Sequence, residues 1–567
     1  MAYIIRVNIS TRQISKCVQD EYKLLGGRAL SSRIVSDQVD PACDPLGEHN
    51  KLVIAPGLLA GTTASSAGRI SVGAKSPLTG GIKEANCGGN SGVYLGRIGV
   101  KAIVIEGRPA DESAYVLKVS KENICLLILN ELRGLGTYDT ARKLQEKFGE
   151  KIAVLCIGPA GERCLRSAAV ASTDPNGELK FAARGGLGAV MGSKGIKAVV
   201  IENPGSRLVP YWDKEAFLQA SKKYNSELTA DPKTKEIFQK VGTNGIFKAV
   251  NAMGALPTRN FSSGSFEFAE NLSGEKMYET ILARGGEGKT GVSCMSGCII
   301  KCSNIYPDAT GKKICSTLQY ENVALLGSNC CLDNLDSVAR LNHICNDFGV
   351  DAIEIGATIG IALEMGLAEF GDEQGCLKLL QEIANNTTLG RILGNGAYLT
   401  GQVFDCRRVP VAKGQAFPGY DPRALKGNGV TYAVSPMGAD HTAGNCFGSR
   451  GEVNPLGVDR QGDLSRTLQI KMTTLDSLGF CIFARNPIFK EPTLISAMVN
   501  ALLGAGLTPE DVWNMGKDTL RVEREFNVRA GLSPCSDRLP EFVYKEKLAP
   551  TGEVFDLQNN EMEKALV

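Results

Sequence analysis

Three cysteines lie close together in the stretch VSCMSGCIIKCSNIY at residues 292–306. Cys294, Cys298 and Cys302 have the spacing C-x3-C-x3-C. Thiolates bind soft metals, and this run is compatible with three corners of a cubane iron–sulfur cluster, whose fourth ligand can lie far away in sequence. Zinc sites usually contain paired C-x2-C knuckles, which are absent here, and the C-x3-C-x2-C pattern of radical S-adenosylmethionine enzymes is missed by one residue. The alternative interpretation is three unrelated structural cysteines.

A fourth thiol must come from another part of the chain. The candidates are Cys330, Cys331, Cys446 and Cys481. Cys481 ends the segment DSLGFC, which has the same form as NDFGVD at 346–351: Asn or Asp, two residues, Gly, an apolar residue, then Asp or Cys. Each segment follows a helical pattern that its glycine is suited to end. The two segments are either ordinary helix ends with a chance similarity or equivalent loops that hold two equivalent halves of a ligand.

The bulk composition is that of a large globular protein. The 567 residues are too many for one ordinary core, so about two to four domains are expected. The net charge of +2 gives no indication of a nucleic acid or an anionic membrane as partner. No apolar run reaches the roughly 18 residues of a membrane helix, and the start of the chain lacks the apolar run of a signal peptide. A cytoplasmic protein is therefore expected. Three histidines among 567 residues exclude a His-rich metal site.

The first 205 residues are rich in glycine and in short β-branched runs, which predict strands. The clearest runs are KLVIAPG (51–57), KAIVIEG (101–107), KIAVLCIG (151–158) and KAVVIEN (197–203). Two of them end an internal repeat with an offset of 96 residues, in which Gly89, Gly92, Gly96 and Gly99 match Gly185, Gly188, Gly192 and Gly195. A repeated unit predicts two pseudo-symmetric halves.

Helical periodicity dominates the rest of the chain. The linker-like stretch ENPGSRLVP (202–210) and the Pro/Gly-rich stretch 407–429 indicate boundaries. Thr508, followed by Pro509 and two acidic residues, is a good helix start. We expect the last twenty or so residues to be a loosely held tail.

Taken as a set, the motifs resemble the aldehyde ferredoxin oxidoreductases, tungsten or molybdenum enzymes with two pterin dithiolenes and one 4Fe–4S cluster. The similarity runs from about residue 3 to 540. Besides the cysteine cluster and the two matching loops, it includes GRISVGAKSPLTGG (68–81), NCGG (86–89), ARGGLGAVMGSK (183–194), YENVALLGSNC (320–330) and SPMGADHTAG (435–444).

The resemblance implies an α+β fold. An N-terminal, pseudo-two-fold β-sheet domain, residues 1–205, would form the base under the two pterins. Two mainly α-helical domains would follow, 206–415 with the clustered cysteines and 416–567 with Cys481. Together they would cover the metal and leave a channel for the substrate.

The resemblance also implies the cluster ligands, Cys294, Cys298, Cys302 and Cys481. The family more often begins this run C-x2-C, so one residue is inserted here between Cys294 and Cys298. Arg69 would hold a pterin phosphate, for which a guanidinium fork is well suited.

Mg²⁺ linking the two pterin phosphates would lie at Asn86 and at the backbone near Phe181, because Mg²⁺ prefers oxygen ligands and keeps several waters. Asp351 and Asp476 would accept hydrogen bonds from pterin N–H groups. The further cofactor contacts that the resemblance implies are Gly88, Ala183, Arg184, Asn346, Val350, Phe480 and Ile482.

For catalysis, Glu321 and His441 match the family's acid/base pair beside the metal. The apolar run NVALLG after Glu321 predicts burial and a raised pKa. The alternative for His441 is a structural histidine beside Asp440. Met437 and Ala443 depart from relatives that carry Arg and Lys at these positions.

The expected activity is oxidation of aldehydes to carboxylic acids, with electrons leaving through the cluster to ferredoxin or to a dedicated iron–sulfur subunit. A homodimer is compatible with the resemblance. The alternatives are a family member that acts on aromatic acyl-CoA thioesters, an unrelated iron–sulfur protein without pterin, and a zinc-stapled structural protein.

Overall fold

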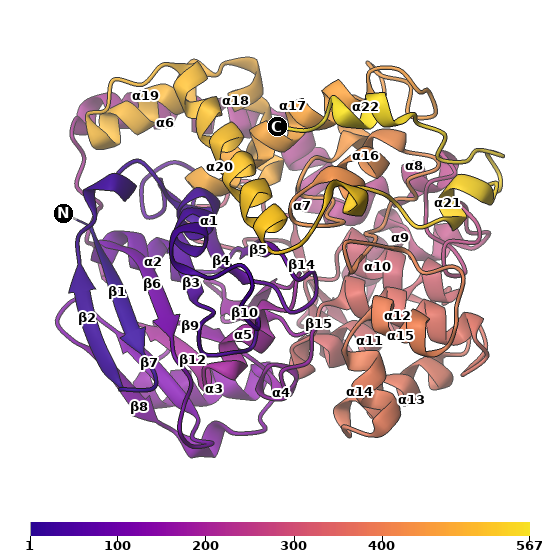
Figure 1. The fold of residues 1–567 in the computed structure, drawn as a ribbon, viewed down its shortest axis with the longest axis horizontal. Helices are drawn as coiled ribbons and strands as arrows, with labels where there is room; N and C mark the ends of the chain where they lie inside the picture. The colour runs from indigo at the N-terminus through magenta and orange to yellow at the C-terminus, as the bar shows by residue number, and fades with distance from the viewer. Residues whose placement is uncertain (1) are drawn as a thin grey trace.

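A computed structural model describes residues 2–567 and confirms the α+β class. Most strands lie in the first 201 residues, where they form two six-stranded sheets (Figure 1). The first sheet, in the order β2-β1-β6-β3-β4-β5, contains β1 Tyr3–Asn8, β2 Gln13–Cys17, β3 Leu52–Pro56, β4 Ile70–Lys75, β5 Ile82–Cys87 and β6 Val100–Glu106. The second, in the order β11-β10-β9-β12-β7-β8, contains β7 Tyr115–Val119, β8 Ile124–Ile128, β9 Ala153–Cys156, β10 Val170–Thr173, β11 Leu179–Ala182 and β12 Ile196–Ile201.

The two sheets are built on one plan. When β1 to β6 are matched with β7 to β12, the first strand order becomes the second order read backwards. Each half has one parallel pair, β1 with β6 and β7 with β12. The sequence repeat forms a helix followed by the last strand of each half. The predicted pseudo-symmetric halves are therefore confirmed, and the four predicted strand runs form β3, β6, β9 and β12.

The halves meet along the edge strands β5 and β11, which lie side by side. Ser76 Oγ donates a hydrogen bond to the Gly185 carbonyl (2.7 Å), and the Asn90 amide donates to the Thr173 carbonyl (2.8 Å). These contacts join the sheets into one base.

Helices cover this base and form the rest of the molecule (Figure 1). Within the base they are α1 Gly27–Gln38, α2 Ser91–Ile98, α3 Thr137–Phe148, α4 Pro159–Glu162 and α5 Leu187–Ser193. The next group contains α6 Lys214–Ala230, α7 Gln239–Val241, α8 Phe247–Ala252, α9 Gly274–Arg284, α10 Tyr320–Leu326, α11 Leu335–Phe348, α12 Ala352–Glu364, α13 Glu373–Ala384, α14 Thr388–Gly394 and α15 Ala397–Val403. The last group contains α16 Lys426–Val434, α17 Gln461–Leu478, α18 Asn486–Lys490, α19 Thr493–Leu503, α20 Pro509–Arg529, α21 Phe542–Lys545 and α22 Asn559–Glu563.

Two small sheets lie among these helices: β13 Lys289–Val292, β14 Ser303–Pro307 and β15 Lys313–Ser316 form one, and β16 Val411–Ala412 with β17 Gln415–Ala416 the other. The boundary predicted after residue 205 lies between β12 and α6, whereas the one predicted after 415 falls inside β17. The division of the helical part stays a prediction.

The helix ends follow the local chemistry. Thr508 caps α20, accepting from the Asp511 amide while the Asp511 carboxylate accepts from the Thr508 amide. Gly349 and Gly479 end α11 and α17 with φ of +78° and +91°, a conformation that favours glycine. The expectation of a loose C-terminal tail was wrong, because Phe555 and other apolar side chains of this segment are buried in the core of the helical part.

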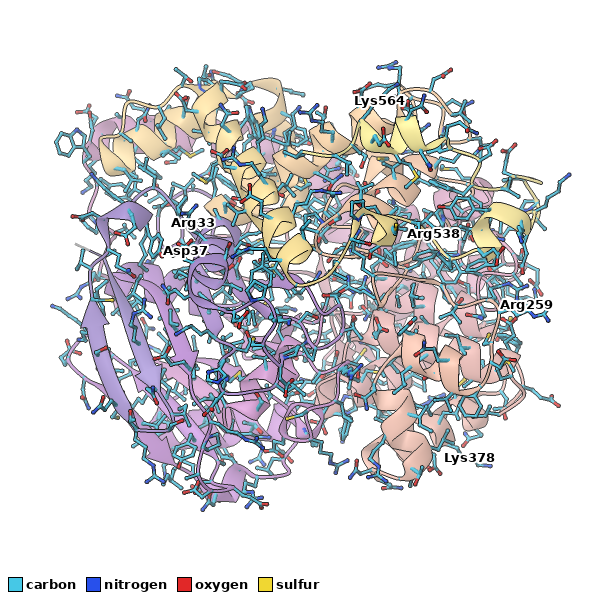
Figure 2. All side chains as sticks on the ribbon, viewed as in Figure 1. Arg33, Asp37, Arg259, Lys378, Arg538 and Lys564 are labelled. Carbon is cyan, nitrogen blue, oxygen red and sulfur yellow. The ribbon has the colours of Figure 1, made fainter. Side chains whose placement is uncertain are left out.

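Charged side chains occupy the outer surface, as Figure 2 shows for Arg33 and Asp37 on α1 and Lys378 on α13. Within residues 2–567 no helix combines the length and the apolar character needed to cross a membrane.

Candidate active site

The four predicted cluster ligands meet at one place. Cys294, Cys298 and Cys302 lie on the loop between β13 and β14, and Cys481 lies in the turn after α17. Cys298, Cys302 and Cys481 are at most 6% exposed and belong to one apolar cluster, against which Cys294 packs.

The other candidates for the fourth thiol lie elsewhere. Cys330 and Cys446 belong to the separate core of the helical part, and Cys331 packs against that core. The structure thus brings only Cys481 to the three clustered cysteines.

The four thiols act on one another electrostatically. A hydrogen bond from the Cys294 thiol to the Cys298 sulfur lowers the pKa of Cys298 to about 6 and raises that of Cys294. Burial raises the pKa of Cys302 and Cys481, and each neighbouring sulfur adds to the effect. Four deprotonated sulfurs this close need a cation between them, because burial penalises each charge.

The donor set fits an iron–sulfur cluster. None of the cysteines in the described chain is in a disulfide. Among residues 2–567, no three His, Cys, Asp or Glu side chains surround a single ion position. A cubane does not require that arrangement, because each thiolate binds a different iron atom.

The two matching loops are structurally equivalent. The Cys481 amide donates to the Ser66 carbonyl (2.8 Å), and the Asp351 amide donates to the Ser167 carbonyl (2.8 Å). The glycine of each loop also lies against a glycine of the base. A Cβ on Gly57 would lie 2.1 Å from Gly479 Cα, and a Cβ on Gly349 would lie 2.8 Å from the amide nitrogen of Gly158. Each loop therefore packs on its own half of the base. That the loops hold two halves of a ligand stays a prediction.

The side chains of these loops have different partners. Asp476 accepts from Asn86 Nδ2 (3.1 Å) and lies 3.5 Å from Arg28. Burial, with the neighbouring Glu84 carboxylate, raises the pKa of Asp476 to about 8. At the equivalent position, Asn346 Nδ2 donates to the Tyr138 hydroxyl (3.4 Å). The two halves thus carry different groups at this point, an ionisable carboxyl in one and a neutral amide in the other.

Arg69 lies near both the cysteines and Asp476. Burial disfavours its charge, but the surrounding Cys481, Cys294 and Cys87 sulfurs raise the pKa of Arg69 above its ordinary value. Its guanidinium donates to the Asn86 side-chain oxygen and to the Asn86 carbonyl.

Asn86 and Phe181, predicted near Mg²⁺, lie on the adjoining edge strands β5 and β11. Both Asn86 oxygens accept a hydrogen bond from Arg69 in this structure, and each retains a second lone pair that a cation could use.

Arg184 follows β11 in the second half of the base. Its guanidinium pairs with Asp351 (3.1 Å) and Glu354 (3.7 Å), and it donates to the Ala439 and Ala416 carbonyls. Burial raises the pKa of Glu354 to about 7. The other predicted cofactor contacts lie in the two loops or directly after β5 and β11: Gly88, Ala183, Val350, Phe480 and Ile482.

Glu321 and His441, the predicted catalytic pair, face each other. His441 Nε2 lies 3.5 Å from Glu321 Oε1, and Glu321 Oε2 accepts from the Gly419 amide (2.6 Å). Burial raises the pKa of Glu321, and His441 opposes this shift. Glu321 Oε1 and His441 Nδ1 are buried without a hydrogen-bond partner within the described structure. The pair can therefore accept and pass on a proton.

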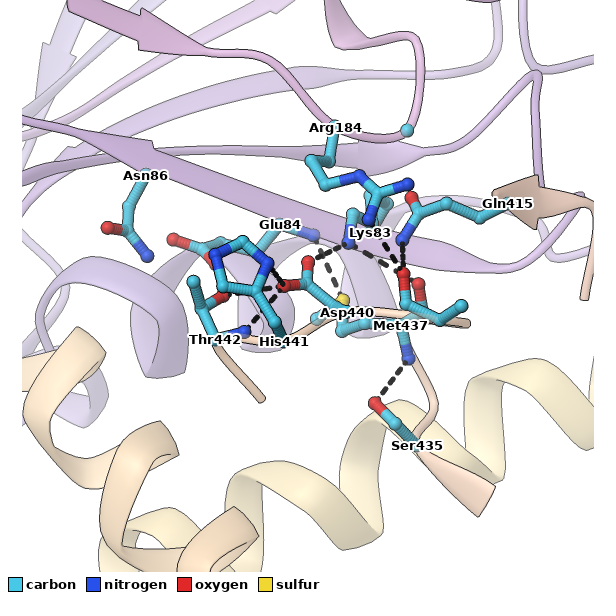
Figure 3. A network of polar contacts seen from close by, with 12 residues as sticks. Lys83, Glu84, Asn86, Arg184, Gln415, Ser435, Met437, Asp440, His441 and Thr442 are labelled. Carbon is cyan, nitrogen blue, oxygen red and sulfur yellow. Dashed lines mark hydrogen bonds and ion pairs between the residues drawn. The ribbon is translucent and has the colours of Figure 1, made fainter. Parts of the chain in front are cut away.

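The sequence analysis did not single out Lys83. This β5 lysine is 1% exposed and forms an ion pair with Asp440 (3.0 Å), the neighbour of His441 (Figure 3). The available signal in the sequence was the charged dipeptide Lys83-Glu84 within the strand β5. Met437 fills the same region, where its sulfur accepts from the Glu84 amide (3.1 Å).

The comparisons with known proteins cover nearly the whole chain. The family model described as "Aldehyde ferredoxin oxidoreductase, N-terminal domain" matches residues 4–203, and "Aldehyde ferredoxin oxidoreductase, domains 2 & 3" matches 219–566. The tungsten-containing aldehyde ferredoxin oxidoreductase of Pyrococcus furiosus is 32% identical, over 97% of this chain and 92% of the relative.

More distant relatives have other names. The WOR-like subunit of an aliphatic sulfonate oxidoreductase of the same organism is 26% identical over 87% of this chain and 80% of its own. A solved structure, the active site complex BamBC of benzoyl coenzyme A reductase, superposes with a TM-score of 0.81 at 18% identity, over 100% of this chain and 93% of the other. At this identity the superposition shows the fold alone.

Proposed function

Because the chain belongs to the aldehyde ferredoxin oxidoreductase family, we propose that it oxidises aldehydes to carboxylic acids at tungsten, or molybdenum, held by two pterin dithiolenes. Four relatives at 31% to 32% identity are named tungsten-containing aldehyde ferredoxin oxidoreductases. The observation that carries the proposal is the meeting of Cys481, which lies in one of the two equivalent loops, with Cys294, Cys298 and Cys302.

The residues present fit the proposed cofactors. Arg69 and Arg184 supply cations for the phosphates, and Asp351 and Asp476 supply acceptors in the equivalent loops. When bound, the bis-pterin metal would supply a two-electron acceptor, and the 4Fe–4S cluster would pass electrons on singly.

The balanced reaction is aldehyde plus water giving carboxylate, three protons and two electrons. Glu321 Oε1 is the proposed base for the adding water, because it is buried, unpartnered and backed by the Gly419 amide on its other oxygen. His441 Nε2, 3.5 Å away, would take the proton from this oxygen and return the carboxylate to its ionised form.

We propose ferredoxin or a dedicated iron–sulfur subunit as the electron acceptor. Cys481 stands five positions after Asp476 in the same loop, which would give electrons a short path from pterin to cluster. A cytoplasmic, oxygen-sensitive enzyme, alone or as a homodimer, agrees with this chemistry.

Relatives named for other substrates, an aliphatic sulfonate and an aromatic acyl-CoA thioester, share 26% and 18% identity with the chain. The higher identity of the aldehyde enzymes favours an aldehyde substrate.

The test is aldehyde-dependent reduction of a viologen dye by anaerobically purified protein, over a panel of aldehydes, with metal analysis of the same sample. We expect about one tungsten or molybdenum and about four irons per chain. Zinc as the sole metal, or no activity with any aldehyde, would refute the proposal. Glu321→Gln should retain both metals and lower the turnover roughly 10²- to 10⁴-fold. Glu364→Gln changes a glutamate that pairs with Arg408, and it should retain both the metals and the turnover.

A further inference from the structure

Asp440 lies between a buried lysine and the proposed catalytic histidine (Figure 3). Its Oδ2 is 3.0 Å from Lys83 Nζ, and its Oδ1 accepts from the Thr442 amide (2.9 Å) and hydroxyl (2.7 Å). The same Oδ1 is 3.9 Å from His441 Nδ1. The carboxylate is therefore fixed from several sides while one oxygen faces the imidazole.

The charges of this group depend on one another. Burial opposes ionisation of Asp440, but Lys83 and Arg184 outweigh it and hold the pKa of Asp440 well below its ordinary value. Burial lowers the pKa of Lys83, whose ammonium is stabilised by Asp440. Lys83 Nζ also donates to the Met437 carbonyl (3.3 Å), so the sheet strand β5 is tied directly to the loop that carries His441.

The imidazole lies between two carboxylates. Nε2 faces Glu321 Oε1 at 3.5 Å, and Nδ1, which is buried without a hydrogen-bond partner in the described structure, faces Asp440 Oδ1. Both separations exceed an ordinary hydrogen bond, and such contacts commonly tighten when a substrate binds. The Tyr420 ring is a further neighbour, with its centroid 6.5 Å from that of His441.

We propose that the Lys83–Asp440 ion pair is the positioning element of the active site: Asp440 holds His441 with Nδ1–H directed to it and Nε2 directed to Glu321, and Lys83 limits the negative potential that Asp440 exerts on the ring. The catalytic part of this inference depends on the proposed function, whereas the orientation of the ring does not. Removing either partner should alter the orientation and the tautomer of the His441 ring. Loss of the Asp440 carboxylate removes the acceptor that faces Nδ1, and loss of Lys83 frees the carboxylate that the ammonium fixes.

The chain is well suited to a direct test, because it has only three histidines, His49, His343 and His441. Holoenzyme labelled with ¹⁵N-histidine would be examined by NMR, with His441 assigned from a His441→Asn variant. The wild-type spectrum should show the neutral ring protonated at Nδ1. Asp440→Asn and Lys83→Met should each move the ring nitrogen chemical shifts of His441 away from this Nδ1–H pattern.

Several controls belong to the same experiment. The ring nitrogen chemical shifts of His49 and His343 should be the same in every variant. Lys83→Arg, which keeps the charge, should retain the wild-type chemical shifts of His441. Lys101→Met removes another lysine of the same sheet, whose ammonium donates to the Lys23 carbonyl, and should leave His441 unchanged. If Asp440→Asn does not yield folded, metal-loaded protein, the shift in Lys83→Met decides the question. Unchanged chemical shifts of His441 in Asp440→Asn and Lys83→Met would overturn the proposal.

Kinetics give the second readout. In the viologen assay, Asp440→Asn should lower kcat roughly 10- to 100-fold with little change in KM, because the ring is misplaced while the substrate site is intact. Should the wild-type enzyme oxidise no aldehyde while His441 shifts as stated, the proposed function is wrong and the positioning stands. Should aldehydes be oxidised without those shifts, the positioning is wrong and the function stands.

Discussion

Cys481 and Asp351 occupy equivalent positions in the two halves of the molecule. Each is the second residue after the glycine that ends its helix, and the amide of each donates at 2.8 Å to a serine carbonyl, that of Ser66 or Ser167. The two side chains have diverged. Asp351 caps the helix α12, whereas Cys481 turns to the three clustered cysteines. A duplicated loop thus carries an acid on one side and the proposed cluster ligand on the other.

The first prediction concerns this thiol. Cys481→Ser should leave the fold intact and reduce the iron content of anaerobically purified protein from about four per chain to three or fewer, because the cluster loses one corner. Electron paramagnetic resonance of the dithionite-reduced protein should lose or change the cluster signal. Cys446→Ser is the matched control, a buried cysteine of the other core, and should keep the wild-type signal. A cluster signal that is lost in Cys446→Ser but kept in Cys481→Ser would contradict the ligand assignment.

The second prediction concerns the space beside the cluster. A Cβ on Gly88 would lie 2.8 Å from the Cys294 carbonyl oxygen and 3.0 Å from its sulfur. Gly88→Ala should therefore displace the cysteine loop and lower the iron content. Gly451, whose added Cβ would meet nothing within 4 Å, provides the control, and Gly451→Ala should retain all iron. Equal iron in both variants would mean that the loop adapts and that Gly88 is not a close contact of the site.

Local patterns predicted much of this architecture. The β-branched runs form strands, the 96-residue repeat reports the duplicated base, and Gly349 and Gly479 end their helices because an apolar residue must turn back onto the base. These features can be recognised from residue types and their spacing along the chain. The ion pairs of the site do not: Lys83 meets Asp440 and Arg28 meets Glu523 only after distant segments have packed, so their residue types carried no partner information.

The third prediction concerns pH. Burial raises the pKa of Glu321 above its ordinary value of 4.5. Glu321 must be ionised to act as a base, so kcat/KM should rise as the pH increases through this raised pKa. At lower pH the carboxylate is protonated and kcat/KM should decrease. The measurement is kcat/KM for one aldehyde across the acidic range, with the metal content checked at each pH. An acid limb at the value of an exposed glutamate, or none, would show that Glu321 is not the base.

The last prediction concerns the contact between the base and the C-terminal helices. Arg28 on α1 donates two hydrogen bonds to Glu523 on α20 (2.9 and 2.8 Å), both side chains are at most 3% exposed, and Arg28 also lies 3.5 Å from Asp476. Glu523→Ala leaves a buried guanidinium without its main partner, which typically costs about 3–5 kcal/mol. The unfolding midpoint, followed by fluorescence at one scan rate under anaerobic conditions, should fall by several degrees.

Helix α1 also supplies the matched control for that prediction. Arg33 pairs with Asp37 one turn away at 3.0 Å, but both side chains are exposed at the surface (Figure 2). Exposed pairs of this kind contribute about 0.3–0.5 kcal/mol, so Arg33→Ala should leave the midpoint nearly unchanged. Both variants remove one member of an ion pair of α1, so the difference between their midpoints measures the effect of burial. If the two variants shifted the midpoint equally, the Arg28–Glu523 pair would not be what joins the base to α20.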